Sequence, residues 1–201
     1  MNILFLGSNS QPRKTLLDNA KILYQILGHT ANEEAVDQSL DLQERVAAIA
    51  RHKMEYVSLP TGKEGQIIFV LTADSMGKAA NGKVYGKPKN KEEAVAILES
   101  LGTQEHSTAT GFCLDKKQYQ NGSWQLVERV EKVVTARYLF EIPKHWIDRY
   151  LEHSWGLNAS SAIAIEQYGE QFLKTITGSY TTVIGLPMFE LRQALEQAGF
   201  Y

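Results

Sequence analysis

The sequence predicts an α/β fold in which a central sheet is flanked by helices. Residues 67–73 form an unbroken, largely apolar run that stops at Asp74, as expected of a strand buried on both faces. Residues 3–6 form a second apolar run, and residues 162–165 form a third run that ends at Glu166. Because open α/β sheets bind ligands at the carboxyl ends of their strands, we expect the polar groups after these runs to converge.

The composition is that of an ordinary globular protein. The chain has 201 residues, of which 43% are hydrophobic and 22% are charged, so it can bury a sizeable core in one domain or in two closely packed halves. A net charge of −2 gives no global attraction for nucleic acid or for an anionic membrane. One cysteine, the lack of a signal peptide and the lack of a long apolar segment favour a cytoplasmic protein.

The first apolar run leads through a polar loop into a helix. Pro12 suits the first helical turn, where its missing N–H has no cost, and Ser10 lies just outside that turn. Ser8, Ser10 and Arg13 would therefore surround the free N–H groups of a helix start, which favours a local anion site. Residues 22–27 are ambiguous, because either this helix continues or a strand begins.

A second helix is predicted after residue 41. Asp41 and Glu44 match the capping-box pattern, and the apolar residues that follow fall on one helical stripe. Lys53 lies near the middle of that stripe, which is an unusual place for a lysine. Its stem could extend to the edge of the sheet, or the ammonium group could have a function, and the sequence leaves both interpretations open.

The rest of the chain alternates between helical and antiparallel patterns. Asn90 is expected to cap a helix that ends at Gly102, and Asn121-Gly122 is expected to join two strands within residues 107–140. A short helix is predicted over residues 143–151, and the last helix over residues 189–198.

The polar residues of these segments suit a phosphate chain with a divalent metal ion. The cations are Arg13, Lys53 and Lys87, and the carboxylates are Glu33 and Asp74. Carboxylate oxygens suit Mg²⁺, whereas the lack of a close pair of His or Cys residues argues against zinc. Taken singly, each residue also has a structural explanation, such as a surface cation for Arg13. The residues alone therefore predict an α/β protein that binds a phosphate ligand.

The order of the motifs resembles the Maf family of nucleoside triphosphate pyrophosphatases. The family pattern has S-x-S-P-R-R, an acidic residue, A-x-x-K-A, A-D-T, G-K-P and G-S-Y-x-x-V-x-G-L-P. The matching segments in this chain cover nearly its whole length: Ser8–Arg13, Glu33, Ala50–Lys53, Ala73–Ser75, Gly86–Pro88 and Gly178–Pro187.

This resemblance implies a fold and a reaction. The implied fold has a mixed central sheet, flanked by helices, with a cleft between two lobes. The implied enzyme is a house-cleaning hydrolase that splits a nucleoside triphosphate between its α- and β-phosphates, with Mg²⁺ or Mn²⁺ as cofactor. Asp74 would accept the proton and help Glu33 to hold the metal. Lys53 and Lys87 would act in catalysis, and Ser8, Ser10 and Arg13 would bind phosphate. A homodimer is also implied.

Substrate choice in this family depends on three positions, which correspond here to Pro12, Ser75 and Glu166. The pyrimidine-preferring branch has Arg, Thr and Gln there. A carboxylate only accepts hydrogen bonds, so Glu166 suits the N–H edge of guanine and resembles the branch that acts on 7-methyl-GTP. Three alternatives stay open: a dTTP/UTP pyrophosphatase, an inosine or xanthosine triphosphatase, and a catalytically weak nucleotide-binding regulator of cell division.

Overall fold

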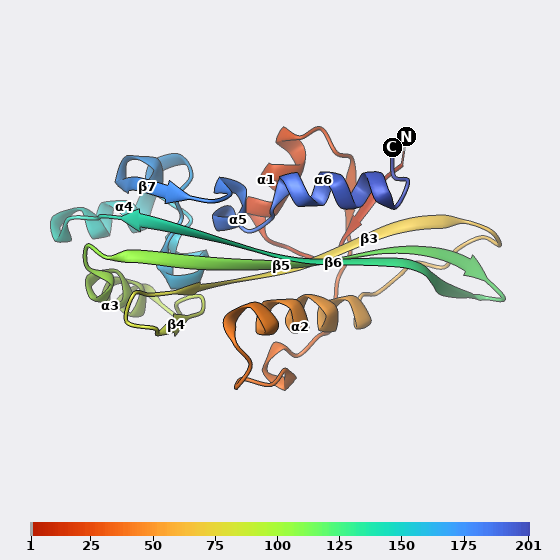
Figure 1. Cartoon of the computed structure of the whole chain (residues 1–201), viewed down its shortest axis with the longest axis horizontal. Helices are drawn as coiled ribbons and strands as arrows, with labels where there is room; N and C mark the ends of the chain where they lie inside the picture. The colour runs from red at the N-terminus through yellow and green to blue at the C-terminus, as the bar shows by residue number, and fades with distance from the viewer. Residues whose placement is uncertain (1) are drawn as a thin grey trace. The chain divides into compact units, whose positions relative to one another are not determined.

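The computed structural model describes residues 2–201, which form two compact units (Figure 1). The first unit comprises Met1–Asp74, Thr110–Val133 and Gly185–Tyr201, and the second comprises Ser75–Ala109 and Val134–Ile184. No helix within residues 2–201 combines the length and the apolar character needed to cross a membrane.

The central feature is a sheet of seven strands in the order β2-β1-β3-β5-β6-β7, with β4 paired to β3. β1 pairs in parallel with β2 and β3, whereas β3–β4 and β6–β7 are antiparallel, so the sheet is mixed. The predicted α/β fold with a mixed, helix-flanked sheet is confirmed. The strands are β1 (Leu4–Leu6), β2 (Tyr24–Ile26), β3 (Ile67–Lys78), β4 (Val84–Tyr85), β5 (Glu105–Gln120), β6 (Ser123–Phe140) and β7 (Leu173–Thr177).

The first unit places helices on both faces of its part of the sheet. Helix α2 (Leu42–Glu55) lies on one face, and helices α1 (Gln11–Asn19) and α6 (Met188–Gln197) lie on the other (Figure 1). On the α2 side, a buried apolar cluster includes Ala50, Met54, Val70 and Cys113. The Thr72 hydroxyl also donates to the Ala50 carbonyl oxygen over 2.6 Å, which fastens α2 to β3.

The second unit has its own aromatic core. Tyr138 and Phe140 of β6 lie in one buried cluster with Tyr150 and Phe172, and the ring of Phe140 meets those of Tyr150 and Phe172 edge-on. Around this core lie α3 (Lys91–Leu101), η2 (Lys144–Trp146), α4 (Ile147–His153), η3 (Gly156–Asn158), η4 (Ser160–Ala162), η5 (Gln167–Phe172) and α5 (Tyr180–Ile184).

The helix boundaries agree with the signals in the sequence. Asp41 and Glu44 form the predicted capping box of α2, and the Asn90 side chain accepts a hydrogen bond from the Glu93 N–H at the start of α3. Gly102 ends α3 with a positive φ of 62°, a conformation that glycine adopts without strain. Residues 24–26 are a strand, which decides the ambiguity left by the sequence.

Two predictions about strand ends are wrong. β3 continues past Asp74 to Lys78, so Asp74 lies within a strand. Residues 163–165 are buried but are not a strand. The buried Tyr150 hydroxyl instead contacts the backbone on either side of Ile163, at Ala162 O (3.0 Å), Ala164 O (3.2 Å) and Ala164 N (2.6 Å). An apolar run that needs burial does not by itself specify where its hydrogen-bond partners come from.

Candidate active site

A buried arginine is fixed at the start of helix α1. The Arg13 side chain donates from Nε to the Gly185 carbonyl oxygen over 2.8 Å and from Nη1 to Ser8 Oγ over 3.1 Å. Ser8 Oγ also accepts the backbone N–H of Ser10 at 3.3 Å. The residues predicted to bind an anion from the sequence therefore do meet at the start of this helix, where Ser10 is the N-cap and Pro12 lies in the first turn.

A buried lysine joins two carboxylates in the same unit. Lys53 Nζ lies 2.8 Å from Asp74 Oδ1 and 2.8 Å from Glu33 Oε1. Lys53 and Asp74 are buried, at 6% and 8% exposure, whereas the Glu33 side chain is half exposed. The ammonium group thus points to the carboxylates and does not extend to the edge of the sheet, and a function for this ion cluster stays a prediction.

The charges of this cluster act on Arg13. Burial lowers the pKa of the Arg13 guanidinium, while the negative charges of Asp74 and Glu33 act in the opposite direction. Two cations and two carboxylates of the first unit are therefore close enough to balance one another. Such a cluster can bind polyanionic phosphate through the cations and still offer a carboxylate oxygen to a water molecule.

Local structure explains how each carboxylate and the lysine reach this cluster. Glu33 begins the short 3₁₀ turn η1 (Glu33–Ala35), which Asn32 caps by accepting the Glu34 N–H over 3.1 Å. Lys53 lies in the last turn of α2 on its buried face, and Asp74 lies on β3 beneath that helix. The helical spacing that put Lys53 on the apolar stripe is therefore what directs it to the sheet.

The carboxylates fit a divalent ion that keeps other ligands. No group of three or more His, Cys, Asp or Glu side chains within residues 2–201 is arranged to hold a metal. Glu33 and Asp74 nevertheless both contact the Lys53 ammonium, so their carboxylates lie close together. Mg²⁺ is commonly held by one or two carboxylates together with water and substrate phosphate, so this pair fits such an ion.

The remaining predicted residues belong to the second unit, where one short segment contacts strand β3 at Ser75 and the loop that holds Lys87. Ser160 Oγ donates to the Ser75 carbonyl oxygen over 2.9 Å, and the Ser161 N–H donates to the Gly86 carbonyl oxygen, beside Lys87, over 3.0 Å. Ser161 has a positive φ of 59°, which is strained for a residue with a side chain. The turn at residues 160–162 therefore contacts both strand β3 at Ser75 and the loop at Gly86-Lys87.

Glu166 lies in a partly buried, acidic and aromatic environment of the second unit. Burial raises the pKa of Glu166, and the charge of Glu170 adds to this, while backbone groups act against it. Burial together with the charges of Glu170 and Glu166 also raises the pKa of Tyr180. Gln167 follows with a positive φ of 55°, so the backbone keeps a conformation that favours glycine.

Several contacts of these residues were not predicted from the sequence. Gly185 fixes Arg13 through its carbonyl oxygen, Thr72 holds α2 on β3, and Ser160 holds the Ser75 backbone. The role of Thr72 could have been suspected from the sequence, because Thr72 is a polar residue inside an apolar run. Gly185 is 172 residues from Arg13 in the sequence, and Ser160 is 85 residues from Ser75, so no local sequence pattern predicts these contacts.

Comparison with known proteins shows the family of this chain. A family model described as "Maf-like protein" matches residues 3–198. The chain is 30% identical over 197 residues to a dTTP/UTP pyrophosphatase of Fusobacterium nucleatum subsp. nucleatum, covering 98% of this chain and 96% of that protein. It is 32% identical over 207 residues to a nucleoside triphosphate pyrophosphatase of Prochlorococcus marinus, covering 98% of both. A HAM1 protein from Coxiella burnetii is similar with a TM-score of 0.36 and 13% identity, covering 72% of this chain and 74% of that one.

Proposed function

Because this chain belongs to the Maf-like protein family, we propose that it is a nucleoside triphosphate pyrophosphatase, a hydrolase that releases pyrophosphate and a nucleoside monophosphate. The observation that carries this proposal is the buried contact of Lys53 with Asp74 and Glu33, beside the buried Arg13. It supplies the groups that phosphoryl chemistry needs, namely a proton acceptor and fixed cations.

In the proposed reaction, Asp74 accepts a proton from the attacking water. The water oxygen bonds to the α-phosphorus. At the same time the bond from the α-phosphorus to the oxygen that bridges the α- and β-phosphates breaks, and pyrophosphate leaves with the electron pair of that bond. Lys53 donates to Asp74 Oδ1 over 2.8 Å and so orients this carboxylate. Arg13, Ser8 and Ser10 bind the phosphate oxygens, and Lys87 is the further residue that we propose to act in catalysis.

A bound Mg²⁺ or Mn²⁺ ion would neutralise charge that develops on the phosphate oxygens. Glu33 and Asp74 are the side chains that would hold it, because both contact the Lys53 ammonium and their carboxylates therefore lie close together. We expect pyrophosphate release to be lost on chelation and to return when either metal is added.

The catalytic assignment is tested by Asp74→Asn, which keeps the shape and the oxygen that Lys53 contacts but removes the charge. We expect kcat/KM for pyrophosphate release to fall by at least about 100-fold. Asp37→Asn, at an exposed aspartate, is the matched control and should keep full activity. Intact turnover in Asp74→Asn would refute the role of Asp74 as proton acceptor.

For the base, we propose guanine-type substrates, 7-methyl-GTP among them. An ionised Glu166 accepts hydrogen bonds from the N1–H and N2–H edge and suits the positive charge of 7-methylguanine. Ser75 and Pro12 would complete the choice of substrate. The second candidate is a pyrimidine triphosphate, because a relative of this chain is named dTTP/UTP pyrophosphatase.

The raised pKa of Glu166 separates these candidates by pH. A protonated carboxyl donates a hydrogen bond and can serve the carbonyl oxygens of uracil or thymine, whereas the carboxylate cannot. We expect the guanine-to-pyrimidine ratio of kcat/KM to rise with pH and to become independent of pH in Glu166→Gln, with pyrimidines then favoured. A ratio that neither pH nor this substitution changes would rule out Glu166 as the base reader.

We further propose that the enzyme acts in the cytoplasm and forms a homodimer. The alternative of a catalytically weak nucleotide-binding regulator makes a different prediction. It requires tight binding of triphosphates by calorimetry with no release of pyrophosphate across a panel of standard and modified nucleotides.

A further inference from the structure

Strand β6 presents a long open edge in the first unit. β5 is its neighbour on one side, and β7 pairs with β6 only from Arg137 onward. Along residues 123–133 the described part of the chain provides no strand on the other side of β6. Unpaired edges of this length readily pair with another strand, so proteins usually cover them or give them protective charges.

The charges on this edge have an unusual symmetry. Around Val130, the sequence Val127-Glu128-Arg129-Val130-Glu131-Lys132-Val133 has opposite charges at equal distances on either side. If a second copy of β6 ran antiparallel with Val130 opposite Val130, Glu128 would face Lys132, Arg129 would face Glu131, and Val127 would face Val133. Each of these pairs would occur twice, because the arrangement is two-fold symmetric.

The same charges disfavour the neighbouring registers. Shifting the pairing by one residue places Glu128 opposite Glu131, or Arg129 opposite Lys132, and like charges directly opposite one another are destabilising. We propose that the β6 edge, residues 127–133, is a self-complementary interface through which two copies of this chain pair antiparallel about Val130.

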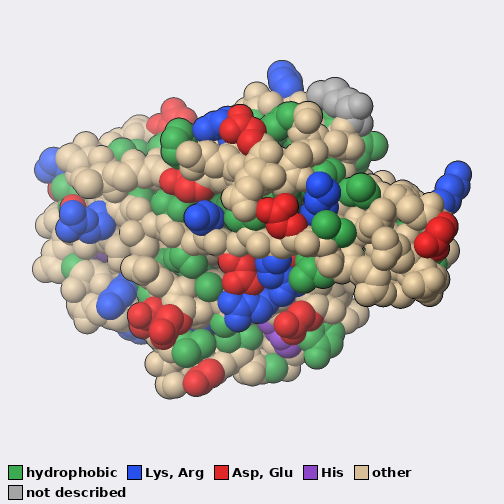
Figure 2. Space-filling view, turned by 45° about the vertical axis from the view of Figure 1, so that its right-hand side comes forward, with side chains coloured by type: hydrophobic (Ala, Val, Ile, Leu, Met, Phe, Trp, Pro, Cys, Tyr) green, Lys and Arg blue, Asp and Glu red, His purple; other side chains and the backbone are tan. Residues whose placement is uncertain are grey.

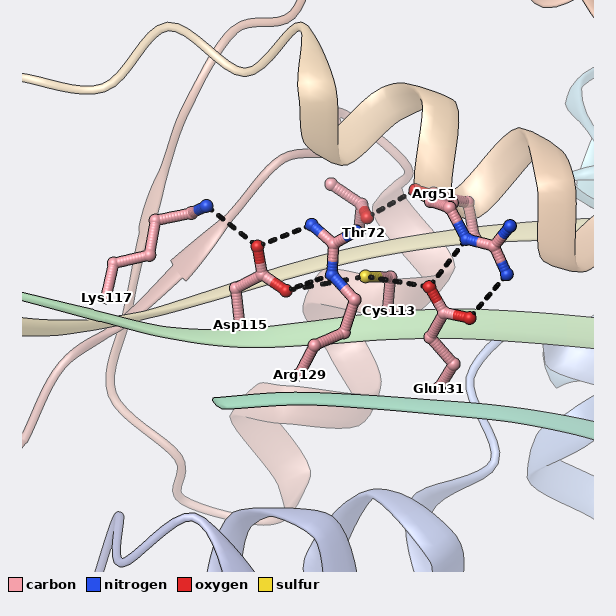
Figure 3. A network of polar contacts seen from close by, with 8 residues as sticks. Arg51, Thr72, Cys113, Asp115, Lys117, Arg129 and Glu131 are labelled. Atoms are coloured by element: carbon pink, nitrogen blue, oxygen red, sulfur yellow. Dashed lines mark hydrogen bonds and ion pairs between the residues drawn. The ribbon is translucent and has the colours of Figure 1, made fainter. Parts of the chain in front are cut away.

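The side chains on one face of β6 are already held for such a pairing. Arg129 binds the buried Asp115 through two hydrogen bonds of 2.7 and 2.8 Å, and Lys117 lies 2.8 Å from the same carboxylate. Glu131 accepts two hydrogen bonds, of 2.7 and 2.6 Å, from Arg51 of α2. Figure 3 shows these residues together between α2 and the strands β5 and β6.

Pairing would join the two networks. The Arg129 and Glu131 side chains remain about a quarter exposed, at 26% and 29%, so each can still meet a charge of the other copy. The alternating order of charges would then continue from one copy into the next. Because both groups are already ordered within the chain, pairing would cost little additional side-chain entropy.

Glu128 and Lys132 lack ion-pair partners among residues 2–201. Lys132 is exposed, and Glu128 accepts a hydrogen bond only from the neutral Gln197, so neither has an opposite charge within 4 Å among residues 2–201. Val127 is 54% exposed, which is high for an apolar residue in a strand. Figure 2 shows that acidic and basic side chains are interspersed on the face of the molecule that it displays.

The test uses charge reversal on the full chain, followed by sedimentation velocity over a range of concentrations. Glu128→Lys would place two lysines opposite each other in a homodimer, and Lys132→Glu would place two glutamates there. Each variant alone should raise the dimer dissociation constant about tenfold or more, because two attractive cross-strand pairs become repulsive. An equimolar mixture of the two variants should associate as tightly as the unmodified protein, because the heterodimer restores every opposite pair.

Lys21→Glu, at an exposed lysine between α1 and β2, several strands away from β6 in the sheet, makes the same change in net charge as Lys132→Glu and should leave association unchanged. The proposal is overturned if the unmodified chain stays monomeric at all concentrations, since the charges would then only protect the edge. It is equally overturned if the mixture associates no better than the single variants. None of these residues belongs to the proposed active site, so failure here would leave the proposed pyrophosphatase activity untouched.

Discussion

Replacing Lys53 by methionine removes the cation between two carboxylates while it keeps an unbranched side chain of similar length. Lys53 Nζ lies 2.8 Å from both Asp74 and Glu33, and the Lys53 side chain is only 8% exposed. The substitution would therefore leave the buried Asp74 carboxylate without its ammonium partner. We expect it to reduce both the stability of the chain and its activity.

The size of the stability loss follows from the geometry. Two unit charges 2.8 Å apart attract by about 6 kcal/mol at an effective dielectric constant of about 20. Desolvation offsets part of that attraction, and breaking a buried pair costs about 3–5 kcal/mol. Arg13 is close enough to Asp74 to compensate in part, so we expect a loss of about 3 kcal/mol. For a chain of this length, that loss lowers Tm by about 6–12 °C.

The assay is urea unfolding followed by circular dichroism. The double variant Lys53→Met/Asp74→Asn should recover about 1–3 kcal/mol relative to Lys53→Met, because no buried carboxylate is then left uncompensated beside the methionine. The Glu33 carboxylate remains there, but its side chain is half exposed and stays hydrated. Lys63→Met, at an exposed lysine, should change stability by less than about 0.5 kcal/mol. A loss below about 1 kcal/mol in Lys53→Met, or strictly additive effects in the double variant, would contradict this account of the ion cluster.

Three further predictions concern the rest of the chain. Tyr150→Phe should lose about 2–3 kcal/mol in urea unfolding, because the buried hydroxyl satisfies the backbone of residues 162–164; an unchanged midpoint would contradict this. Gln167→Gly should raise Tm slightly or leave it unchanged, since it relieves a φ of 55°, and a clear fall would show that the side chain matters more than the backbone. Hydrogen bonds from Arg51 are the main cause of the lowered pKa of Glu131. The ionised Glu131 should therefore stabilise the fold fully above about pH 4.5, and this contribution should be lost as the pH falls further. Glu131→Gln should weaken the loss of unfolding free energy in acid, and an unchanged pH dependence would contradict this.

Much of the local structure could be predicted from single residues. Asp41 with Glu44 and Asn90 with Glu93 marked helix starts, because a capping side chain acts within one turn of its own helix. The apolar stripe of α2 placed Lys53 toward the sheet, because helical periodicity fixes the direction of each side chain. Short-range rules of this kind do not depend on the rest of the fold.

The strand predictions failed where segments far apart in the sequence supply the hydrogen-bond partners. The apolar run at residues 162–165 indicated a strand, yet Tyr150 supplies the hydrogen bonds that a neighbouring strand would have supplied. The run ending at Asp74 did not show that β3 continues to Lys78, because β4 pairs with Gly77 and Lys78 from farther along the chain. Burial can be recognised in a sequence, but pairing partners cannot.

For the candidate site, the sequence by itself determined which groups are available: Ser8, Ser10 and Arg13 at a helix start, Lys53 on a buried face, and the carboxylates Glu33 and Asp74. Only the tertiary structure decided that one ammonium group contacts both carboxylates and that a distant carbonyl oxygen fixes Arg13. The physical reason is that a side chain's type and helical phase are local properties. The partner that makes burying its charge affordable comes from elsewhere in the fold.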